Sequence, residues 1–369
     1  MAFDPFSLAQ PGICELQPYQ PGKPVDELER ELGISNIIKL ASNENPLGPS
    51  PKAVAAMQAV IKDSARYPDG NGFALKQALA AHHNIDQQRI TLGNGSNDVL
   101  ELLARVFAGP GLQILFSEHA FAVYPIAAKS VGADAVIVPA KDWGYDLDAI
   151  LSSIDESSRL VFIANPNNPT GTWLTAGDLK QFLDRVPEHV VVVLDEAYAE
   201  YVQTPGYPDS LPWLQQYPNL VVTRTFSKAY GLAALRVGYA LSSPAIADLL
   251  NRVRQPFNVN ALALAAAEAA LADTDYLEQS IAVNESGMKQ LTRGFESRGL
   301  DYIPSVGNFV SVDIARESTP VFNALLKEGV IVRPVANYGM PTHLRVTVGT
   351  EQENTRFLNA LDTVLASPA

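Results

Sequence analysis

The middle of the chain alternates between amphipathic helical stretches and short runs of mostly apolar residues. Helical spacing is found at residues 51–62, 73–82 and 98–107. The apolar runs lie at residues 113–116, 135–139, 160–164, 190–194, 220–223 and 237–241. Near-continuous Val, Ile and Leu over so few residues indicate strands that are buried on both faces. The alternation predicts an α/β fold, with a large domain at residues 46–258 built on a mostly parallel central sheet.

The two ends of the chain have a different pattern. Helices are expected at residues 261–273, 276–298, 320–328 and 354–365, and strands at residues 306–313, 330–334 and 344–348. Residues 259–369 are therefore predicted to form a smaller α+β domain. Pro and Gly are frequent in residues 1–45, which indicates an extended N-terminal arm with one short helix at residues 26–32. We expect this arm to pack with the smaller domain and with a partner subunit.

Composition limits the classes of function. The chain has 369 residues, 47% of them hydrophobic and 18% charged, and a net charge of −13. No block of Lys and Arg interrupts this acidity, so we expect neither nucleic acid nor a membrane surface as a partner. The single cysteine, Cys14, excludes an internal disulfide, and the five histidines have no metal-binding spacing, so no metal is expected. The N-terminus lacks a signal-peptide pattern, and we expect a cytoplasmic protein.

Polar residues follow four of the predicted strands at the point where each strand ends. A Gly-rich turn at residues 93–97 follows the apolar residues 90–92, and an Asn-Pro loop at residues 165–171 follows residues 160–164. The two further segments are Asp195-Glu196-Ala197-Tyr198 and Thr223-Arg224-Thr225-Phe226-Ser227-Lys228. Because ligands bind beyond the carboxyl ends of the strands in open parallel sheets, these segments are predicted to share one site.

Each segment also has an ordinary structural interpretation. A Gly-rich turn before a helix is common, Asn-Pro loops are often plain turns, Asp can be a helix cap, and a single Lys is usually a solvated surface residue. Their occurrence together favours catalysis with pyridoxal phosphate. That cofactor requires a lysine for a Schiff base, an acid facing the pyridine nitrogen, and donors for a phosphate group, which the helix after Gly95 can supply.

The same segments resemble fold-type I aminotransferases of class I/II. The resemblance rests on Asn168-Pro169-Thr170-Gly171, on the Asp195 and Lys228 segments, and on Arg236 within residues 231–238. The matches run in the family's order and extend from Tyr19 to Gly349. The resemblance implies that Lys228 carries the cofactor's aldehyde and moves the proton, and that Asp195 faces the pyridine nitrogen.

The resemblance implies roles for further residues. Tyr198 and Asn168 would donate to the ring hydroxyl oxygen, and Phe121 would stack on the ring. Arg345 would grip the carboxylate of the substrate, or an equivalent anion, because its planar fork matches such oxygens. The expected phosphate ligands are Gly95, Ser96, Asn97, Thr225, Ser227 and Arg236.

Several other segments are similar to histidinol-phosphate aminotransferases. They are Tyr19 with residues 21–24, residues 40–48, residues 66–70, and residues 332–334 with 344–347. The reaction implied is the exchange of an amino group between histidinol phosphate and 2-oxoglutarate, which gives imidazole-acetol phosphate and glutamate in histidine biosynthesis. Arginines accept either anion, so one site can hold both substrates.

Four more residues take roles from this second resemblance. Tyr19 and Asn43 would contact the substrate. Arg333 would either bind the substrate or form a structural salt bridge. Tyr67 would reach the cofactor phosphate of the neighbouring subunit, which implies a homodimer with shared sites.

Alternatives stay open at this stage. Phe121 stands where many histidinol-phosphate enzymes have Tyr, and close relatives prefer phenylalanine or tyrosine as substrates. An aromatic aminotransferase is therefore the main alternative, and a pyridoxal-phosphate decarboxylase acting on a phosphorylated amino acid is a further one. A non-catalytic ligand-binding or regulatory module of the same fold would be expected to lack Lys228 or Asp195, and both are present.

Overall fold

A seven-stranded sheet forms the centre of the larger part of the molecule. The structure is a computed structural model that describes residues 3–10, 12–18 and 22–366. The strand order is β2-β8-β7-β6-β5-β3-β4. The strands are β2 (Ile90–Gly93), β3 (Gln113–Ser117), β4 (Asp134–Val138), β5 (Ser158–Ala164), β6 (Val191–Asp195), β7 (Leu220–Thr225) and β8 (Gly238–Leu241). All pairings from β4 across to β7 are parallel, which confirms the α/β class with a mostly parallel sheet.

Only β8 runs against its neighbours, β7 and β2. The connection from β7 to β8, residues 226–237, contains the 3₁₀ turn Ala233–Leu235 but no α-helix. A parallel return usually needs a crossover helix, and because this connection contains none, the chain turns back antiparallel. The sequence of β8 is as apolar as that of its neighbours and carries no sign of this direction.

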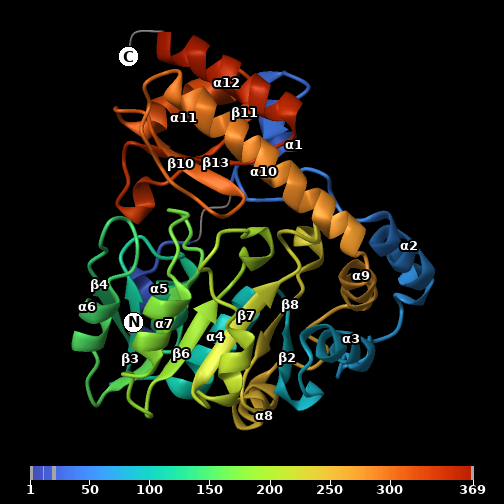
Figure 1. Ribbon diagram of the computed structural model, residues 1–369, viewed down its shortest axis with the longest axis vertical. Helices are drawn as coiled ribbons and strands as arrows, with labels where there is room; N and C mark the ends of the chain where they lie inside the picture. The colour runs from blue at the N-terminus through green and yellow to red at the C-terminus, as the bar shows by residue number, and fades with distance from the viewer. Residues whose placement is uncertain (1–2, 11, 19–21, 367–369) are drawn as a thin grey trace.

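Helices cover the sheet and close one continuous core (Figure 1). Their starts follow from local chemistry: Ser50 and Ser243 each cap a helix whose first residue is proline. At the centre of the sheet, Phe162, Val193 and Val221 are completely buried. The helices of this part are α2 (Pro51–Val60), α3 (Phe73–His83), α4 (Ser96–Phe107), α5 (Val123–Ser130), α6 (Leu147–Ser152), α7 (Ala176–Leu183), α8 (Pro244–Val253) and α9 (Ala261–Leu271).

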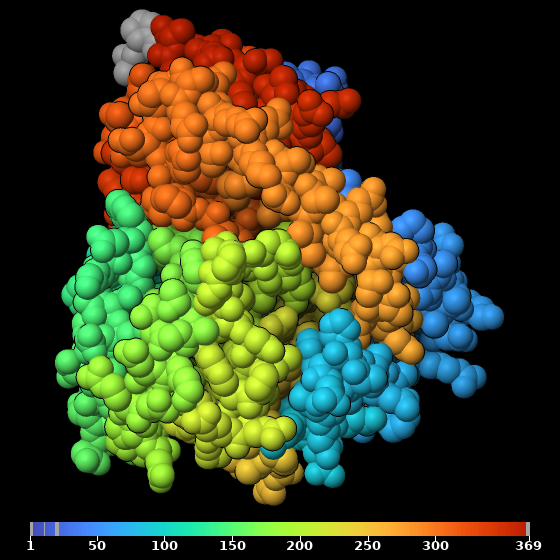
Figure 2. Space-filling model, in the orientation of Figure 1, coloured from blue at the N-terminus to red at the C-terminus, as the bar shows by residue number. Residues whose placement is uncertain are grey.

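A second core lies in the smaller part, which is orange and red in Figures 1 and 2 and sits directly on the larger one. Its four-stranded sheet has the order β12-β13-β10-β9. The elements are α10 (Thr274–Glu296), β9 (Tyr302–Ile303), β10 (Phe309–Asp313), α11 (Ser318–Lys327), β11 (Val330–Ile331), β12 (Arg333–Pro334), β13 (His343–Thr347) and α12 (Glu351–Ala366). The run expected as one strand at residues 330–334 is divided, because β11 pairs with β1 (Ile38–Lys39) and β12 pairs with β13.

Packing does not change from one core to the other at residue 259. Helix α9 follows that residue, yet its buried Ala263 and Ala267 belong to the larger core. Leu277, near the start of α10, still packs on the larger core, whereas Leu291 and Phe295 lie in the smaller one. We therefore propose that the boundary between the two domains lies within α10.

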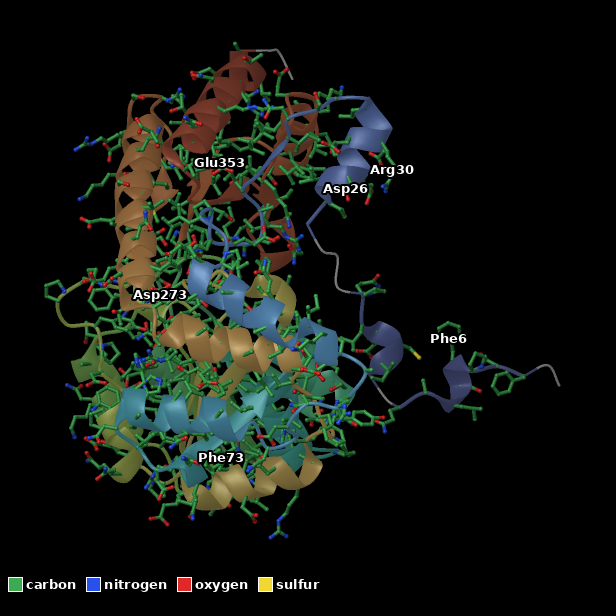
Figure 3. All side chains as sticks on the ribbon, turned by 90° about the vertical axis from the view of Figure 1, so that its right-hand side faces the viewer. Phe6, Asp26, Arg30, Phe73, Asp273 and Glu353 are labelled. Atoms are coloured by element: carbon green, nitrogen blue, oxygen red, sulfur yellow. The ribbon has the colours of Figure 1, made fainter. Side chains whose placement is uncertain are left out.

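The N-terminal segment joins the smaller part through apolar contacts. Leu28 of α1 (Val25–Leu32) is buried against Ala41, Leu326 and Ile331. Further toward the N-terminus, the segment around Phe6 stands away from the body of the molecule (Figure 3), and Phe6 is 73% exposed. Within the described part of the chain, no helix has both the length and the apolar character needed to cross a membrane.

Candidate active site

An open cavity lies at the carboxyl ends of β5, β6 and β7, facing β12 and β13 of the smaller sheet. It brings together most of the residues that the sequence predicted for the site. Those that line it are Asn43, Ser96, Asn97, Phe121, Asn168, Asp195, Tyr198, Thr225, Ser227, Lys228, Arg236, Arg333 and Arg345.

Three predicted residues are not among the lining residues. Gly95 lies against Arg236, which lines the cavity. Tyr67 is 82% exposed on the outer surface, where its ring stacks on Phe257 with 4.6 Å between ring centroids. Tyr19 lies outside the described residues.

Lys228 is the only lysine among the described residues that line the cavity, and it is the third residue after the end of β7. Its Nζ donates a hydrogen bond of 2.9 Å to the backbone carbonyl of Ser42. Burial, together with the positive charge of Arg345, lowers the pKa of Lys228 to about 7. A large fraction of this amine is therefore neutral near pH 7, and a neutral amine is both a nucleophile and a base.

Asp195 is the last residue of β6 and is buried at the floor of the cavity. One carboxylate oxygen accepts from the Tyr124 hydroxyl at 3.0 Å and the other from the Thr223 hydroxyl at 2.9 Å. Burial raises the pKa of Asp195, and these two hydrogen bonds oppose the rise. The arrangement fixes a carboxylate that a cationic ligand group would stabilise in its charged form.

Tyr198 and Asn43 form a second polar contact beside Lys228. The hydroxyl oxygen of Tyr198 accepts from the Asn43 side-chain amide at 3.0 Å. Burial raises the pKa of Tyr198 to about 12, so its hydroxyl keeps its proton at neutral pH and can donate to a ligand oxygen. Asn43 is in turn held by hydrogen bonds with Thr347 and Asn308.

Arg236 and the start of α4 form the cationic end of the cavity. The guanidinium donates to the Ser227 hydroxyl at 3.2 Å, and no carboxylate within residues 3–10, 12–18 and 22–366 forms a salt bridge with it. Gly95 permits this approach, since a Cβ there would lie 2.5 Å from Arg236 Nη2. Ser96 begins α4, whose first backbone N–H groups and positive dipole end attract an anion.

Arg345 and Arg333 stand directly opposite each other on β13 and β12. Arg345 donates to the Asn168 side-chain oxygen at 2.5 Å and to the Ala41 carbonyl at 2.7 Å, and its guanidinium lies over the Phe309 ring at 5.5 Å. These contacts orient a planar cation at the edge of the cavity that faces the smaller sheet.

The charges of the lining residues oppose the charge of the whole chain. Arg236, Arg333 and Arg345 are cationic, Lys228 is partly protonated near pH 7, and Asp195 is the only acidic side chain among the described lining residues, although the net charge of the protein is −13. Cationic groups focused in one cavity attract anionic ligands in preference to neutral ones.

Several residues of the site were not anticipated from the sequence. Thr223 lies at the end of a predicted strand, but no role at the site was predicted for it. It pairs in register with Asp195, so an alignment of the two strands could have placed it beside that carboxylate. Tyr124 and Ser42 gave no signal, because one lies inside a helix and the other contributes a backbone carbonyl. Tyr338 also lines the cavity, from the smaller domain.

The family model described as aminotransferase class I and II matches residues 35–361. The chain belongs to the class I and II aminotransferases. This aminotransferase is 64% identical to histidinol-phosphate aminotransferase 2 of Pseudomonas fluorescens over 368 residues, covering 99% of this chain and 100% of that protein. It is 63% identical to histidinol-phosphate aminotransferase 2 of Pseudomonas aeruginosa, covering 98% and 99% of the two chains.

Its fold is shared with solved structures. The histidinol-phosphate aminotransferase from Sinorhizobium meliloti, solved in complex with pyridoxal 5'-phosphate, superposes with a TM-score of 0.89 at 31% sequence identity, covering 99% of both chains. The histidinol-phosphate aminotransferase of Clostridium acetobutylicum superposes with a TM-score of 0.82 at 27% identity, covering 89% of this chain and 99% of that one.

The lowered pKa of Lys228 predicts how its amine reacts in the cofactor-free protein. A small amine-reactive reagent should modify Lys228 with a pH midpoint of about 7, because only the neutral amine reacts. In the urea-unfolded protein the midpoint should return to the ordinary lysine value of about 10.4. Mass spectrometry of the peptide that contains Lys228 measures both curves, and equal midpoints would contradict the prediction.

Proposed function

We propose that this aminotransferase uses pyridoxal phosphate to exchange an amino group between histidinol phosphate and 2-oxoglutarate, giving imidazole-acetol phosphate and glutamate in histidine biosynthesis. The observation that carries the proposal is that the cationic groups of the cavity lie in two separate places. Arg236 lies with the start of α4 at one end, and Arg333 and Arg345 lie on the smaller sheet. Such a cavity can hold a cofactor phosphate and a separate substrate anion. The names of the relatives agree with this choice.

The residues present fit pyridoxal phosphate. The cationic end around Arg236 suits its phosphate, and buried Asp195, with its two hydroxyl donors, suits its pyridine nitrogen. When bound, the cofactor supplies an electron sink that allows the substrate carbon bearing the amino group to lose a proton. The residues proposed to hold it are Gly95, Ser96, Asn97, Phe121, Asn168, Asp195, Tyr198, Thr225, Ser227, Lys228 and Arg236.

Lys228, Asp195 and Tyr198 are the proposed catalytic residues. Lys228 Nζ is neutral often enough at pH 7 to accept a proton from the substrate carbon and to return it. The negative charge of the Asp195 carboxylate would stabilise a positive charge on the pyridine nitrogen of the cofactor. The Tyr198 hydroxyl keeps its own proton and donates a hydrogen bond, a role for which its high pKa suits it.

Arg345 and Arg333 are proposed to bind the anionic groups of both substrates, with Asn43 and Tyr19 as further substrate contacts. Histidinol phosphate carries a phosphate and no carboxylate, whereas glutamate carries two carboxylates. A guanidinium fork binds either group through paired hydrogen bonds. The cytoplasmic location expected from the sequence stays a prediction.

A substrate panel tests the proposed reaction. The purified enzyme should transfer the amino group of histidinol phosphate to 2-oxoglutarate with a kcat/KM far above that for phenylalanine or tyrosine. The reason is that the aromatic amino acids lack the phosphate that the cationic residues favour. A higher kcat/KM for phenylalanine or tyrosine would overturn the substrate assignment and support an aromatic aminotransferase instead.

Replacement of Arg345 tests the shared anion site. Hydrogen bonds to charged groups contribute roughly 1.5–3 kcal/mol, so Arg345→Ala should raise KM for histidinol phosphate and for glutamate by about 10- to 100-fold. Arg345→Lys should recover only part of this loss, because the fork is missing. Steady-state kinetics with each substrate provide the measurement.

The control for this replacement is Arg298→Ala, which removes an arginine that pairs with Asp362 on the smaller domain. It should leave both KM values unchanged. An increase in KM for glutamate alone after Arg345→Ala would refute the shared site and make Arg333 the candidate for phosphate recognition.

We further propose a homodimer in which Tyr67 donates to the cofactor phosphate of the partner subunit. Tyr67 is exposed and lies outside the cavity of its own chain, so it can serve a site only across an interface. Its stacking on Phe257 places two exposed aromatic rings together on this surface. In a two-fold dimer each subunit lends and receives the same residue.

Subunit complementation tests the dimer. Tyr67→Ala and Lys228→Ala should each have little activity, and mixing them with subunit exchange should restore a statistical fraction, because one site of the heterodimer has neither lesion. The matched control mixes wild type with the double variant Tyr67→Ala/Lys228→Ala, whose heterodimer has no intact site. Exchange confirmed by mass without restored activity would show that Tyr67 acts within its own subunit.

A further inference from the structure

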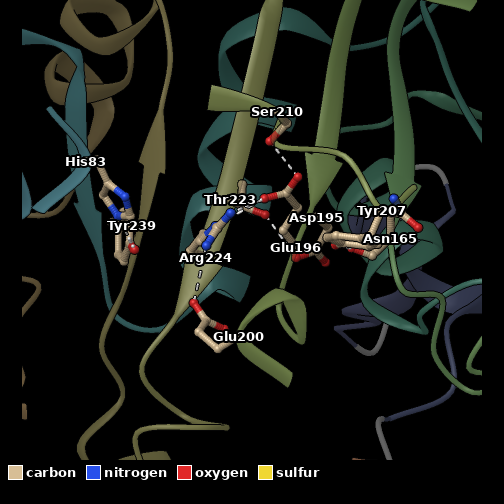
Figure 4. A network of polar contacts seen from close by, with 10 residues as sticks. All are labelled: His83, Asn165, Asp195, Glu196, Glu200, Tyr207, Ser210, Thr223, Arg224 and Tyr239. Carbon is tan, nitrogen blue, oxygen red and sulfur yellow. Dashed lines mark hydrogen bonds and ion pairs between the residues drawn. The ribbon is translucent and has the colours of Figure 1, made fainter. Parts of the chain in front are cut away.

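A buried network of ion pairs lies behind the site, between the ends of β6 and β7 (Figure 4). Its centre is Arg224, whose side chain is 16% exposed. Side chains alternate along a strand, so Arg224 points away from Thr223 and Thr225, which face Asp195 and the cavity. None of the roles proposed above uses Arg224.

Arg224 binds two carboxylates. Its Nε and Nη2 donate to one oxygen of Glu196 at 3.1 and 2.6 Å, and its Nη1 lies 3.6 Å from an oxygen of Glu200. The other oxygen of Glu196 accepts from the Ser210 hydroxyl at 2.6 Å. The side chains of Glu196 and Glu200 are 0% and 7% exposed, so these contacts are shielded from water.

The two glutamates stand two residues before and two residues after Tyr198. The Arg224 guanidinium therefore contacts Glu196 and Glu200, which lie on either side of Tyr198 in the same short turn. Arg224 also follows Thr223 in the chain, and the Thr223 hydroxyl donates to the Asp195 carboxylate. The backbone amide of Glu196 donates to the Thr223 carbonyl at 2.9 Å. We propose that Arg224 is a positioning residue that fixes Tyr198 relative to Lys228.

The charges of the network favour a permanent cation at this position. Burial opposes the charge of Arg224, yet Glu196 and Glu200 together raise its pKa above the usual arginine value. Burial raises the pKa of Glu200, and Arg224 opposes the rise. A guanidinium presents donors in several directions at once, whereas a lysine ammonium on a flexible stem does not hold two carboxylates in a fixed geometry.

This inference rests on the proposed use of pyridoxal phosphate, and a double-mutant cycle tests it. If Arg224 acts through Tyr198, Arg224→Lys and Tyr198→Phe should each lower kcat about tenfold with less than a twofold change in KM. The kcat of the double variant should be no more than about twofold lower than the kcat of either single variant. A purely structural role would instead lower the melting temperature and leave kcat per bound cofactor unchanged.

A second readout needs no amino donor. The pH midpoint of the visible absorbance of the bound cofactor should shift in the same direction in Arg224→Lys and in Tyr198→Phe, and the two shifts should not add. Failure of the wild type to use histidinol phosphate would count against the proposed substrate and leave this absorbance cycle intact.

Controls separate positioning from general damage. Arg298→Lys changes a remote arginine that grips Asp362 with two nitrogens, and it should leave kcat and the absorbance midpoint as in the wild type. If Arg224→Lys does not fold, Glu200→Gln, which releases one end of the turn, takes its place in the cycle. Additive effects on kcat and on the absorbance midpoint, or unchanged values in the Arg224 or Glu200 variant, would overturn the inference.

Discussion

Three consecutive residues, Ala41, Ser42 and Asn43, each contact a different functional group of the cavity. The Ala41 carbonyl accepts from Arg345, the Ser42 carbonyl accepts from Lys228, and the Asn43 amide donates to Tyr198. A buried cation is stable only where oxygen atoms replace its water. Because these oxygens come from backbone that also packs on the smaller domain, the N-terminal segment, the lysine of the larger domain and the arginine of the smaller domain are arranged as one unit.

This dependence explains how an acidic chain builds a cationic site. Outside the cavity, several Lys and Arg side chains pair with carboxylates, as Lys39 does with Glu44 and Arg298 with Asp362. At the cavity, Lys228, Arg236 and Arg345 donate to neutral carbonyl, amide and hydroxyl oxygens. Neutral acceptors orient a guanidinium without cancelling its charge, so the charge stays available to an anionic ligand. Behind the site, outside the set of lining residues, Arg224 is paired with two carboxylates.

The sequence predicted the sheet and most of the lining residues, because both depend on local patterns. Apolar runs mark buried strands, and the residues after them gather at one edge, so Asp195 and Lys228 were expected side by side. Contacts made by backbone carbonyls, such as those of Ala41 and Ser42, leave no trace in residue type and were missed. The reversed direction of β8 and the place of α9 in the larger core follow from chain length and packing, which single-residue patterns do not encode. The proposed role of Tyr67 depends on a second subunit.

Helix α10 belongs to both cores at once, since Leu277 packs on the larger core and Leu291 in the smaller one. Its 23 residues span about 35 Å of unbroken backbone hydrogen bonding. At Gly287 the helix approaches Val348 so closely that a Cβ would lie 2.5 Å from a Val348 methyl carbon. A helix clamped in this way behaves as a strut. Because it packs in both cores, it resists sliding of one core past the other and so helps to keep Arg345 of the smaller sheet in place relative to Lys228.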